Sequence, residues 1–429
     1  MAQTTIPFSL QLFFLCSFLP LLSSSTQQQS PTLSLSPSDL NSLLQINNSL
    51  TDLPGSHFFS TWDFSSPNPC FSFSGVICSR SSPFSSFLQI SSLSLGTGLT
   101  DSPGLTGTLP AAIADLSALE QLIVYAGAIT GPIPSRISNL NSLLLLSITN
   151  NLISGPIPDS ISTLPNLHTL DLSHNRLHGS IPPSLAALPG LKVLILADNR
   201  LSGQVPEILS QLIHLDLKKN ALSGRLPHLP STLRYLSASD NAMWGPLDNL
   251  RSLPDLEFLD LGMNGFSGVI PESLFLNGNG GAYKLTSVLL QRNNLTGGIP
   301  AVPPDGHSAM VGSTVDLSHN GLSGELSTVL AEAESVYLNN NRFTGMVPLE
   351  YARSVYSGSM KTLYVQHNYL SGFPVPAGSP LPLSASLCVS YNCMVPPVGP
   401  TACPASAGEQ QWRPAYQCSI FNRSSVING

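Results

Sequence analysis

Charged residues are scarce in this chain: Asp, Glu, Lys and Arg make up 10% of its 429 residues. The formal net charge of −7 is spread thinly, without a run of like charges of the kind that binds nucleic acid or lipid. We therefore expect no nucleic-acid partner. Few charges also leave few candidates for acid–base catalysis, whereas 33 Gly and 37 Pro favour a chain with many turns.

Long apolar runs are missing after the N-terminus. An apolar stretch from Ile6 to Leu22 is followed by small residues, which is the layout of a secretory signal peptide without its usual positive start. An uncleaved anchor is the alternative, but Pro20 and the serines interrupt a run that barely reaches the ~18 to 20 residues of a membrane span. The C-terminus also lacks the apolar tail of a lipid-anchor signal. We expect residues 1–25 to be removed and the mature chain to be secreted, with no membrane span.

Cysteine is missing from the whole middle of the chain, between Cys78 and Cys388. Cys16 lies in the predicted signal peptide, and an even number of cysteines then remains, which in a secreted chain favours disulfides over metal thiolates. We predict no metal or cofactor. Four C-terminal cysteines permit three pairings, and the sequence does not choose among them. The predicted disulfide cysteines are Cys70, Cys78, Cys388, Cys393, Cys403 and Cys418.

A repeat of 21 to 29 residues fills the region without cysteine. Segments such as "LHTLDLSHNRLHGSIP" and "LKVLILADNRLSGQVP" share the frame L-x-x-L-x-L-x-x-N-x-L-x-G-x-I-P. Gly98 and Gly127 take the place of the Asn in the first two of about twelve copies. The Asn of the frame recurs at Asn151, Asn175, Asn199, Asn220, Asn241, Asn264, Asn293, Asn320, Asn341 and Asn368.

Each fixed position of the frame has a physical role. L-x-L alternates apolar and polar residues, as in a short strand with one buried face, so Leu170 and Leu172 should point inward and Asp171 outward. One copy cannot bury its leucines alone, so the copies must stack and their strands form one parallel sheet inside a solenoid. The Asn should turn inward and pair backbone groups, forming a buried ladder. L-x-G-x-I-P predicts a second short strand, and the remainder leaves room for about one turn of helix.

This frame resembles the plant-type extracellular leucine-rich repeat, whose hallmark is the added L-x-G-x-I-P segment. Upstream, "STWDFSSPNPCFSFSGVIC" is similar to the N-terminal cap of that family, although Phe73 stands where the family usually has Trp. The resemblance implies an α/β repeat solenoid, a curved leucine-rich-repeat superhelix with a parallel concave sheet and disulfide caps at both ends. The expected parts are a signal peptide (1–25), an N-terminal cap (26–86), about twelve repeats (87–373), and a Pro-rich junction with a Cys-containing C-terminal cap (374–429).

Asp171, His174 and His178 lie within eight residues and suggest a catalytic or metal site. The frame argues against it, because His319 occupies the position of His174 in a copy that lies ~29 Å away along the stack. The outward acids Asp171, Asp216 and Asp260 do not occur in adjacent copies, and their ~10 Å spacing exceeds the ~6.5 to 9.5 Å of inverting glycosidases. We therefore predict that the protein is not an enzyme.

The outward strand positions are better candidates for binding. The centre of the array is acidic, and its C-terminal end carries Tyr and Arg side chains of the kind that anchor interfaces. The alternative is that these are ordinary solvated residues. The predicted ligand-binding residues are Asp171, His174, Asp216, Lys218, Asp260, Arg292, Asp316, Tyr337, Asn339, Tyr364 and Gln366.

Three Asn-x-Ser/Thr sequons predict glycosylation at Asn47, Asn294 and Asn422. Beyond the Pro-rich junction, the C-terminal cysteines predict a disulfide-held cap on the last repeat. Trp412 and Tyr416 offer a second interpretation of this tail, as a docking module for a membrane receptor.

The resemblance implies a secreted, non-enzymatic recognition protein of the cell wall space (the apoplast), which binds a protein or peptide ligand on its concave face in signalling or defence. Similar proteins are the ectodomains of receptor-like kinases and receptor-like proteins, so the resemblance implies a membrane receptor kinase as a partner. One alternative is an inhibitor of pectin-degrading polygalacturonases, although that family usually has about ten regular copies and more cap cysteines. The other is a structural or stress-related wall protein.

Overall fold

The computed structural model describes residues 33–422 except 67, 81–84, 100–101, 276–284, 302–309, 376–379, 395–402, 409 and 411. The predicted signal peptide, residues 1–25, lies outside the described residues. The chain divides into two units, Met1–Leu33 and Ser34–Gly429, and the secondary-structure elements of the described residues belong to the second unit.

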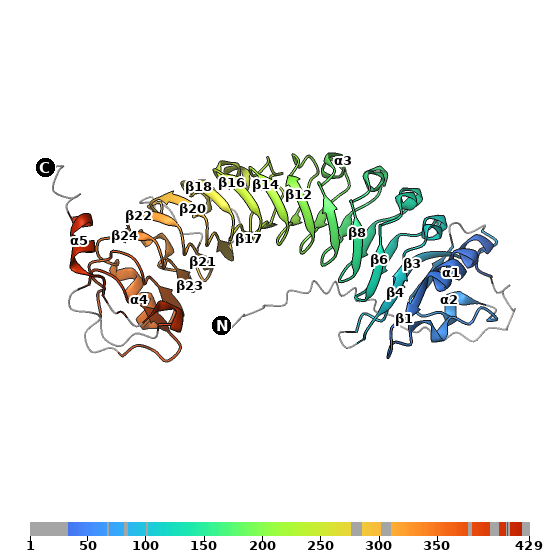
Figure 1. The fold of residues 1–429 in the computed structure, drawn as a ribbon, viewed down its shortest axis with the longest axis horizontal. Coiled ribbons are helices and arrows are strands. Elements are labelled where there is room, and N and C mark those ends of the chain that lie inside the picture. The colour runs from blue at the N-terminus through green and yellow to red at the C-terminus, as the bar shows by residue number, and fades with distance from the viewer. Residues whose placement is uncertain are drawn as a thin grey trace, which may run out of the picture. The chain divides into compact units, whose positions relative to one another are not determined.

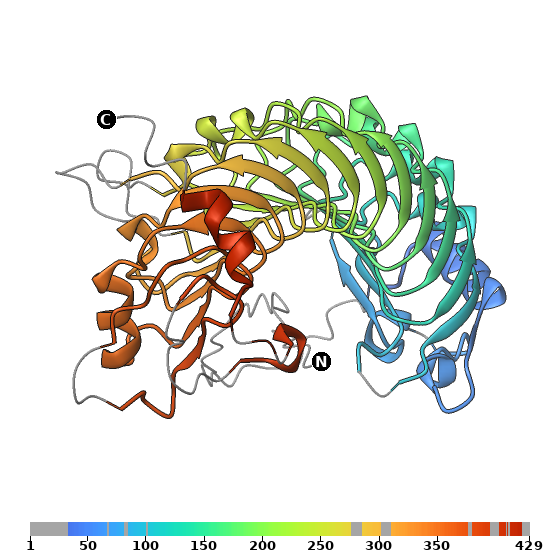
Figure 2. The ribbon, with the colours of Figure 1, turned by 60° about the vertical axis from the view of Figure 1, so that its left-hand side comes forward.

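Two long sheets run through the repeats, and each repeat from β3 to β24 contributes one strand to each sheet (Figure 1). The larger, which we call the concave sheet, has 14 strands and lines the inner side of the curved array (Figure 2). Its strands are parallel except for the antiparallel pair β2–β3. They are β2 (Val76–Ser79), β3 (Gln89–Leu95), β5 (Gln121–Val124), β7 (Leu145–Ile148), β9 (Thr169–Asp171), β11 (Val193–Ile195), β13 (His214–Asp216), β15 (Tyr235–Ser237), β17 (Phe258–Asp260), β19 (Ser287–Leu289), β21 (Thr314–Asp316), β23 (Ser335–Tyr337), β25 (Thr362–Tyr364) and β26 (Ser386–Cys388).

The second sheet, which we call the lateral sheet, has 12 strands. Its first strand, β1, belongs to the N-terminal cap, and the strands from β4 to β24 are formed by the L-x-G segments, as the frame predicts. Its first pair, β1–β4, is antiparallel and the rest are parallel. They are β1 (Leu50–Asp52), β4 (Leu105–Thr108), β6 (Ala128–Gly131), β8 (Leu152–Gly155), β10 (Arg176–Gly179), β12 (Arg200–Gln204), β14 (Ala221–Gly224), β16 (Ala242–Gly245), β18 (Gly265–Gly268), β20 (Asn294–Gly297), β22 (Gly321–Glu325) and β24 (Arg342–Thr344).

Short helices occupy the outer side of the array (Figure 2). Within the repeats most are single turns, as predicted, but α4 is a longer helix that is capped by Gly358 in the left-handed conformation. The α-helices are α1 (Pro37–Ser49), α2 (Pro69–Ser72), α3 (Pro183–Ala186), α4 (Leu349–Ser357) and α5 (Ala415–Asn422). The 3-10 helices are η1 (Phe58–Thr61), η2 (Ala111–Asp115), η3 (Ser135–Asn139), η4 (Asp159–Thr163), η5 (Asp248–Ser252), η6 (Glu272–Leu274), η7 (Thr328–Leu330) and η8 (Ala405–Ala407).

One continuous core runs between the sheets and the outer helices. The two leucines of each L-x-L segment point into it, and Leu170 and Leu172 are fully buried. Covering such a side chain contributes about 1.5 to 3 kcal/mol. Because each leucine is covered by the copies before and after it, the repeats stabilise one another.

The predicted asparagine ladder is present. The Asn220 side-chain amide donates to the carbonyls of Leu196 and Leu217 at 3.0 and 3.1 Å, and its oxygen accepts from the Leu201 N–H at 2.9 Å. All ten predicted asparagines make equivalent bonds, from Asn151 to Asn368. Each amide joins two copies, so the ladder holds the register of the stack.

A left-handed residue precedes each of these ladder asparagines. Its φ lies between 53° and 58°, although the residue is never glycine. Asn, Asp and His tolerate this conformation, but Lys219, Met263 and Arg292 adopt it as well. The reason is geometric, because the chain must turn sharply out of the concave strand to bring the next Asn inward.

The array extends one strand beyond residue 373, where the repeats were expected to end. β26 pairs with β25 in parallel, and the Asn392 side chain bonds Val365 and Leu370 as the other ladder asparagines bond their neighbours. "SLCVSYN" is therefore a further copy of the frame, although no L-x-G-x-I-P segment follows it.

Disulfides lie near both ends, as predicted. Cys70–Cys78 lies in the N-terminal cap, where Trp62 and Phe73 stack at a ring distance of 5.2 Å, so Phe73 packs as part of the cap. At the other end the structure selects one of the three possible pairings, Cys388–Cys403 and Cys393–Cys418.

The C-terminal cap is held by Arg413 in addition to its disulfides. The Arg413 guanidinium lies between the rings of Tyr369 and Tyr391, at 4.0 and 4.5 Å from their centroids, and its Nε donates to the Asn368 carbonyl at 2.8 Å. Cation–π contact and a charged hydrogen bond therefore close the end of the array.

Candidate functional site

The concave sheet presents alternate residues of every strand to its open side, and the strand register aligns these residues in columns. Each three-residue strand contributes its first and third residues. We call the third residues the aspartate column; from β9 to β21 they are Asp171, Ile195, Asp216, Ser237, Asp260, Leu289 and Asp316. We call the first residues the aromatic column; over the same strands they are Thr169, Val193, His214, Tyr235, Phe258, Ser287 and Thr314.

Four aspartates of this column occupy every second strand, β9, β13, β17 and β21. At ~4.8 Å per strand, consecutive carboxylates are ~9.6 Å apart along the stack. Each accepts a hydrogen bond from the N–H two residues on, at 2.9 to 3.1 Å. These aspartates therefore also cap the ends of their own strands, a structural role that the sequence interpretation did not include.

Burial raises the pKa of Asp171, Asp260 and Asp316, because the charged carboxylate loses water. Hydrogen bonds oppose this rise: Ser173 donates to Asp171, and the Ser239 hydroxyl donates to Asp260 at 2.6 Å. The Lys218 ammonium lies 3.4 Å from Asp216, which is buried. The column is thus a row of partly desolvated acids with one cation beside it.

The aromatic column contains a stack of three rings that sequence reasoning missed. The rings of His214 and Tyr235 are 4.0 Å apart and tilted by 2°, and those of Tyr235 and Phe258 are 4.4 Å apart and tilted by 3°. Burial lowers the pKa of His214 and raises that of Tyr235. The signal was available in the sequence, since all three residues immediately precede the first leucine of L-x-L.

The edge of the concave sheet carries the left-handed residues. His174 lies there with φ 55°, and its Nδ1 is 3.1 Å from an Asp198 oxygen. Arg292, also at φ 55°, is exposed. Asn339, two residues after the end of β23, is half-buried. These residues are at the rim of the face and separate from the aromatic stack.

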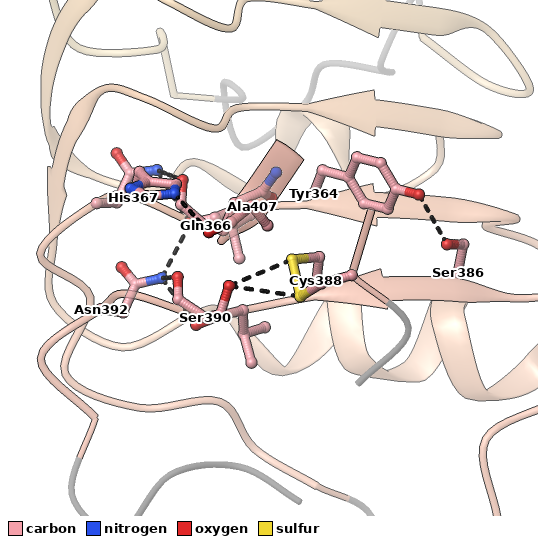
Figure 3. Close-up of a disulfide and its surroundings, with 12 residues drawn as sticks. Tyr364, Gln366, His367, Ser386, Cys388, Ser390, Asn392 and Ala407 are labelled. Carbon is pink, nitrogen blue, oxygen red and sulfur yellow. Dashed lines mark hydrogen bonds between the residues drawn. A yellow bond between two sulfur atoms is a disulfide. The ribbon is translucent and has the colours of Figure 1, made fainter. Parts of the chain in front are cut away.

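The C-terminal end of the face carries two tyrosines in contact. Tyr337 and Tyr364 pack edge to face with ring centroids 5.4 Å apart, and both are half-buried. The Tyr364 hydroxyl is 3.0 Å from the Ser386 hydroxyl (Figure 3). This pair is in the predicted position for a contact patch, next to the end of the array.

Gln366, one of the predicted binding residues, is covered in the structure, and its side chain is 3% exposed. The C-terminal tail packs against this end of the face: Cys403 is bonded to Cys388, and the Ala407 carbonyl accepts from His367 Nε2 at 2.9 Å. Figure 3 shows Ala407 beside Gln366 and His367. The surface open to a ligand therefore ends near Tyr364.

The predicted glycosylation sites and the two aromatic residues of the C-terminal tail lie in different parts of the chain. Asn294 begins β20 and is exposed, whereas Asn47 is half-buried in α1. Asn422 ends α5. Trp412 and Tyr416 of the C-terminal cap are 52% and 70% exposed.

Among the described residues, no group of three or more His, Cys, Asp or Glu is arranged to hold a metal ion. Within the same part of the chain, none of the helices is both long and apolar enough to span a membrane.

Comparison with known families agrees with this geometry. Residues 36–79 match the leucine rich repeat N-terminal domain, residues 165–210 match two copies of the leucine rich repeat, and residues 255–277 match one more. The chain is a leucine-rich repeat protein. No curated protein sequence shows a significant match to it.

Solved structures place this leucine-rich repeat protein beside plant receptor ectodomains. The ectodomain of GASSHO1/SCHENGEN3 from Arabidopsis thaliana, in complex with Casparian strip integrity factor 2, is 26% identical with a TM-score of 0.62 over 83% of this chain and 47% of its own. The plant peptide hormone receptor RGFR1 in complex with RGF2 is 29% identical, with a TM-score of 0.55 over 67% of this chain and 50% of its own.

A shorter relative is similar over almost its full length. A plant ice-binding protein is 27% identical with a TM-score of 0.55, over 80% of this chain and 99% of its own. By contrast, the chain spans about half the length of the TDR, PEPR1, GASSHO1/SCHENGEN3 and RGFR1 receptor structures.

Proposed function

We propose that this leucine-rich repeat protein is a secreted, non-enzymatic recognition protein that binds a peptide or protein ligand on its concave face, in cell-surface signalling or defence in the cell wall space. The observation that carries the proposal is the pairing of two unlike columns on that face. Partly desolvated aspartates lie beside stacked aromatic rings, and such a combination offers both charge and apolar area to a ligand.

The similar plant receptors support the proposal, because one of them is a peptide hormone receptor in complex with its ligand. A membrane receptor kinase is the partner through which such a chain would act. The predicted site residues other than Gln366 lie on or at the rim of the concave face, and the proposal assigns them to ligand contact.

The test is capture of ligands from extracellular fluid with the purified protein, followed by mass spectrometry. Tyr337→Ala with Tyr364→Ala removes two half-buried rings from the concave face. Trp244→Ala, on the lateral sheet, is the control because that ring is similarly accessible at 49%. We expect the double variant to lose ligands that the control retains. A ligand lost only by the control would place binding on the lateral sheet and contradict the proposal.

Two other functions have separate tests. A polygalacturonase inhibitor would lower the activity of fungal pectin-degrading enzymes in a direct assay. A stress-related role has one supporting observation, the likeness to an ice-binding protein. In most lateral strands the residue before the glycine is an exposed or half-exposed Ser or Thr, and these residues form a row. His178 and Trp244 interrupt the row, which argues against a stress-related role. Thermal hysteresis measured on the purified protein decides whether this row binds ice.

A further inference from the structure

The centre of the concave face combines three features on neighbouring strands. The aspartate column contributes Asp216 on β13 and Asp260 on β17, and the next acid along, Asp316, is on β21. The stacked rings of His214, Tyr235 and Phe258 lie two residues earlier on β13, β15 and β17. An acidic row and an apolar row therefore run side by side along the stack, ~6.7 Å apart.

Ser237 lies between the two central acids. The register pairs it with Asp216 on one side and Asp260 on the other, so its side chain projects from the same face of the sheet as theirs. The residue is 0% exposed, and its hydroxyl has no hydrogen-bond partner among the described residues. A buried hydroxyl without a partner costs free energy, and this one lies between the two central acids.

The spacing of the acids selects the conformation of a ligand that runs along the stack. Carboxylates on alternate strands repeat every ~9.6 Å. A polyproline-II chain has three residues per turn and rises ~3.1 Å per residue, so that every third side chain falls on one side at ~9.3 Å. In a β-strand, side chains on one side repeat at ~6.7 Å, a spacing that does not match the ~9.6 Å between the carboxylates. An α-helix would need residues seven apart, at ~10.5 Å.

We propose that this part of the concave face binds a basic polyproline-II segment, with Lys or Arg at every third position paired to Asp216, Asp260 and Asp316, and with the intervening Pro rings packed on the His214–Tyr235–Phe258 stack. This inference rests on the proposed function and names the chemistry of its ligand. Proline-rich segments bind aromatic-lined surfaces because their extended conformation is already formed before binding. The acids select cationic segments among them.

Substitutions at the acids can remove charge and still keep the hydrogen bonds that these side chains accept from the backbone. An asparagine side-chain oxygen can still accept from the Lys218 and Gly262 N–H groups that Asp216 and Asp260 now pair with. Asp216→Asn with Asp260→Asn is therefore the test variant. Asp248→Asn, in the exposed η5 outside both sheets, changes one acid elsewhere and is the control.

The experiment measures binding of fluorescent peptides to the full chain by anisotropy. The peptides are repeats of Pro-Pro-Lys, repeats of Pro-Pro-Glu, and a peptide of the first composition with its lysines clustered at one end. We expect Pro-Pro-Lys to bind and the other two to bind at least about tenfold more weakly, a difference of about 1.4 kcal/mol. The double Asn variant should lose a similar factor, and the control should match the parent chain.

Further measurements distinguish binding at this site from nonspecific electrostatic binding. Tyr235→Ser should weaken Pro-Pro-Lys binding, while Tyr416→Ser on the exposed tail should not. Melting temperatures of all variants show whether each is folded. Equal binding of clustered and regular lysines, no effect of the double Asn variant in a folded protein, or equally tight binding of a cationic polysaccharide would overturn the inference. If captured ligands still depend on the concave face, the proposed function survives that result.

Discussion

The side-chain amide of Asn220 donates a hydrogen bond to the carbonyl oxygen of Leu196, one copy earlier in the array, at 3.0 Å. The same amide also bonds within its own copy, to Leu217 at 3.1 Å. One side chain thus fixes the turn out of its own strand and the position of the preceding copy. Because a similar bond follows every concave strand from β7 to β26, the ladder is a repeated link between neighbours.

Asn220→Ala should destabilise the protein by about 2 to 4 kcal/mol, because the backbone groups that the side chain pairs would remain buried without partners. Chemical unfolding followed by circular dichroism measures the change. Asn166→Ala is the control, since that exposed side chain makes one bond to the Asn141 carbonyl. Equal losses for the two variants would show that the ladder adds nothing beyond an ordinary surface hydrogen bond.

Met263→Asn should stabilise the protein by about 0.5 to 1 kcal/mol, since Met263 has φ 55°, a conformation that Asn tolerates better. The Met side chain is 48% exposed, so little apolar burial is lost. Val269→Asn serves as the control at a position of similar exposure, and that residue is not among those with positive φ. A drop in melting temperature for Met263→Asn would refute the argument from backbone strain.

Stability should fall as the pH rises above 3.8, the ordinary pKa of an aspartate, until the raised pKa of Asp260 is passed. In that interval the folded carboxyl holds a proton that the unfolded one has released, so the unfolded state is favoured by increasing pH. Asp260→Asn should make the dependence shallower. Thermal unfolding across this range measures the slopes, and parallel slopes for variant and parent would contradict the raised pKa.

Removal of the Cys388–Cys403 disulfide, as Cys388→Ser with Cys403→Ser, should cost about 3 kcal/mol, the value expected for a closed loop of this length. The two cysteines are 15 residues apart. The tail should also leave the end of the concave sheet, so hydrogen exchange around Gln366 should become faster than in the parent. Unchanged exchange there would mean that other contacts, such as His367 with Ala407, hold the tail without the disulfide.

The repeat architecture could be predicted from the sequence because its causes are local. Leu170 and Leu172 alternate with Asp171, and a repeated pattern of this kind buries its leucines by stacking each copy on the next. The inward Asn and the second strand follow from the same frame, since their partners lie at a fixed place in neighbouring copies. The copy at β26 escaped prediction because its frame is not followed by an L-x-G-x-I-P segment, so it lacks the hallmark of the other copies.

The candidate site depended on relations between copies, which the frame does not specify. The stack of His214, Tyr235 and Phe258 exists because three consecutive copies place rings in register, although each ring alone resembles any residue beside a leucine. The burial of Gln366 depended on where the tail returns, and the pairing of Cys388 with Cys403 depended on the same return.

The sequence by itself therefore determined the solenoid, its core and its ladder, because each rests on contacts between equivalent positions of adjacent repeats. Only the tertiary structure decided which outward residues are open to a ligand. That depends on lateral stacking across strands and on contacts of the C-terminal cap, which bring together residues without any fixed spacing along the chain.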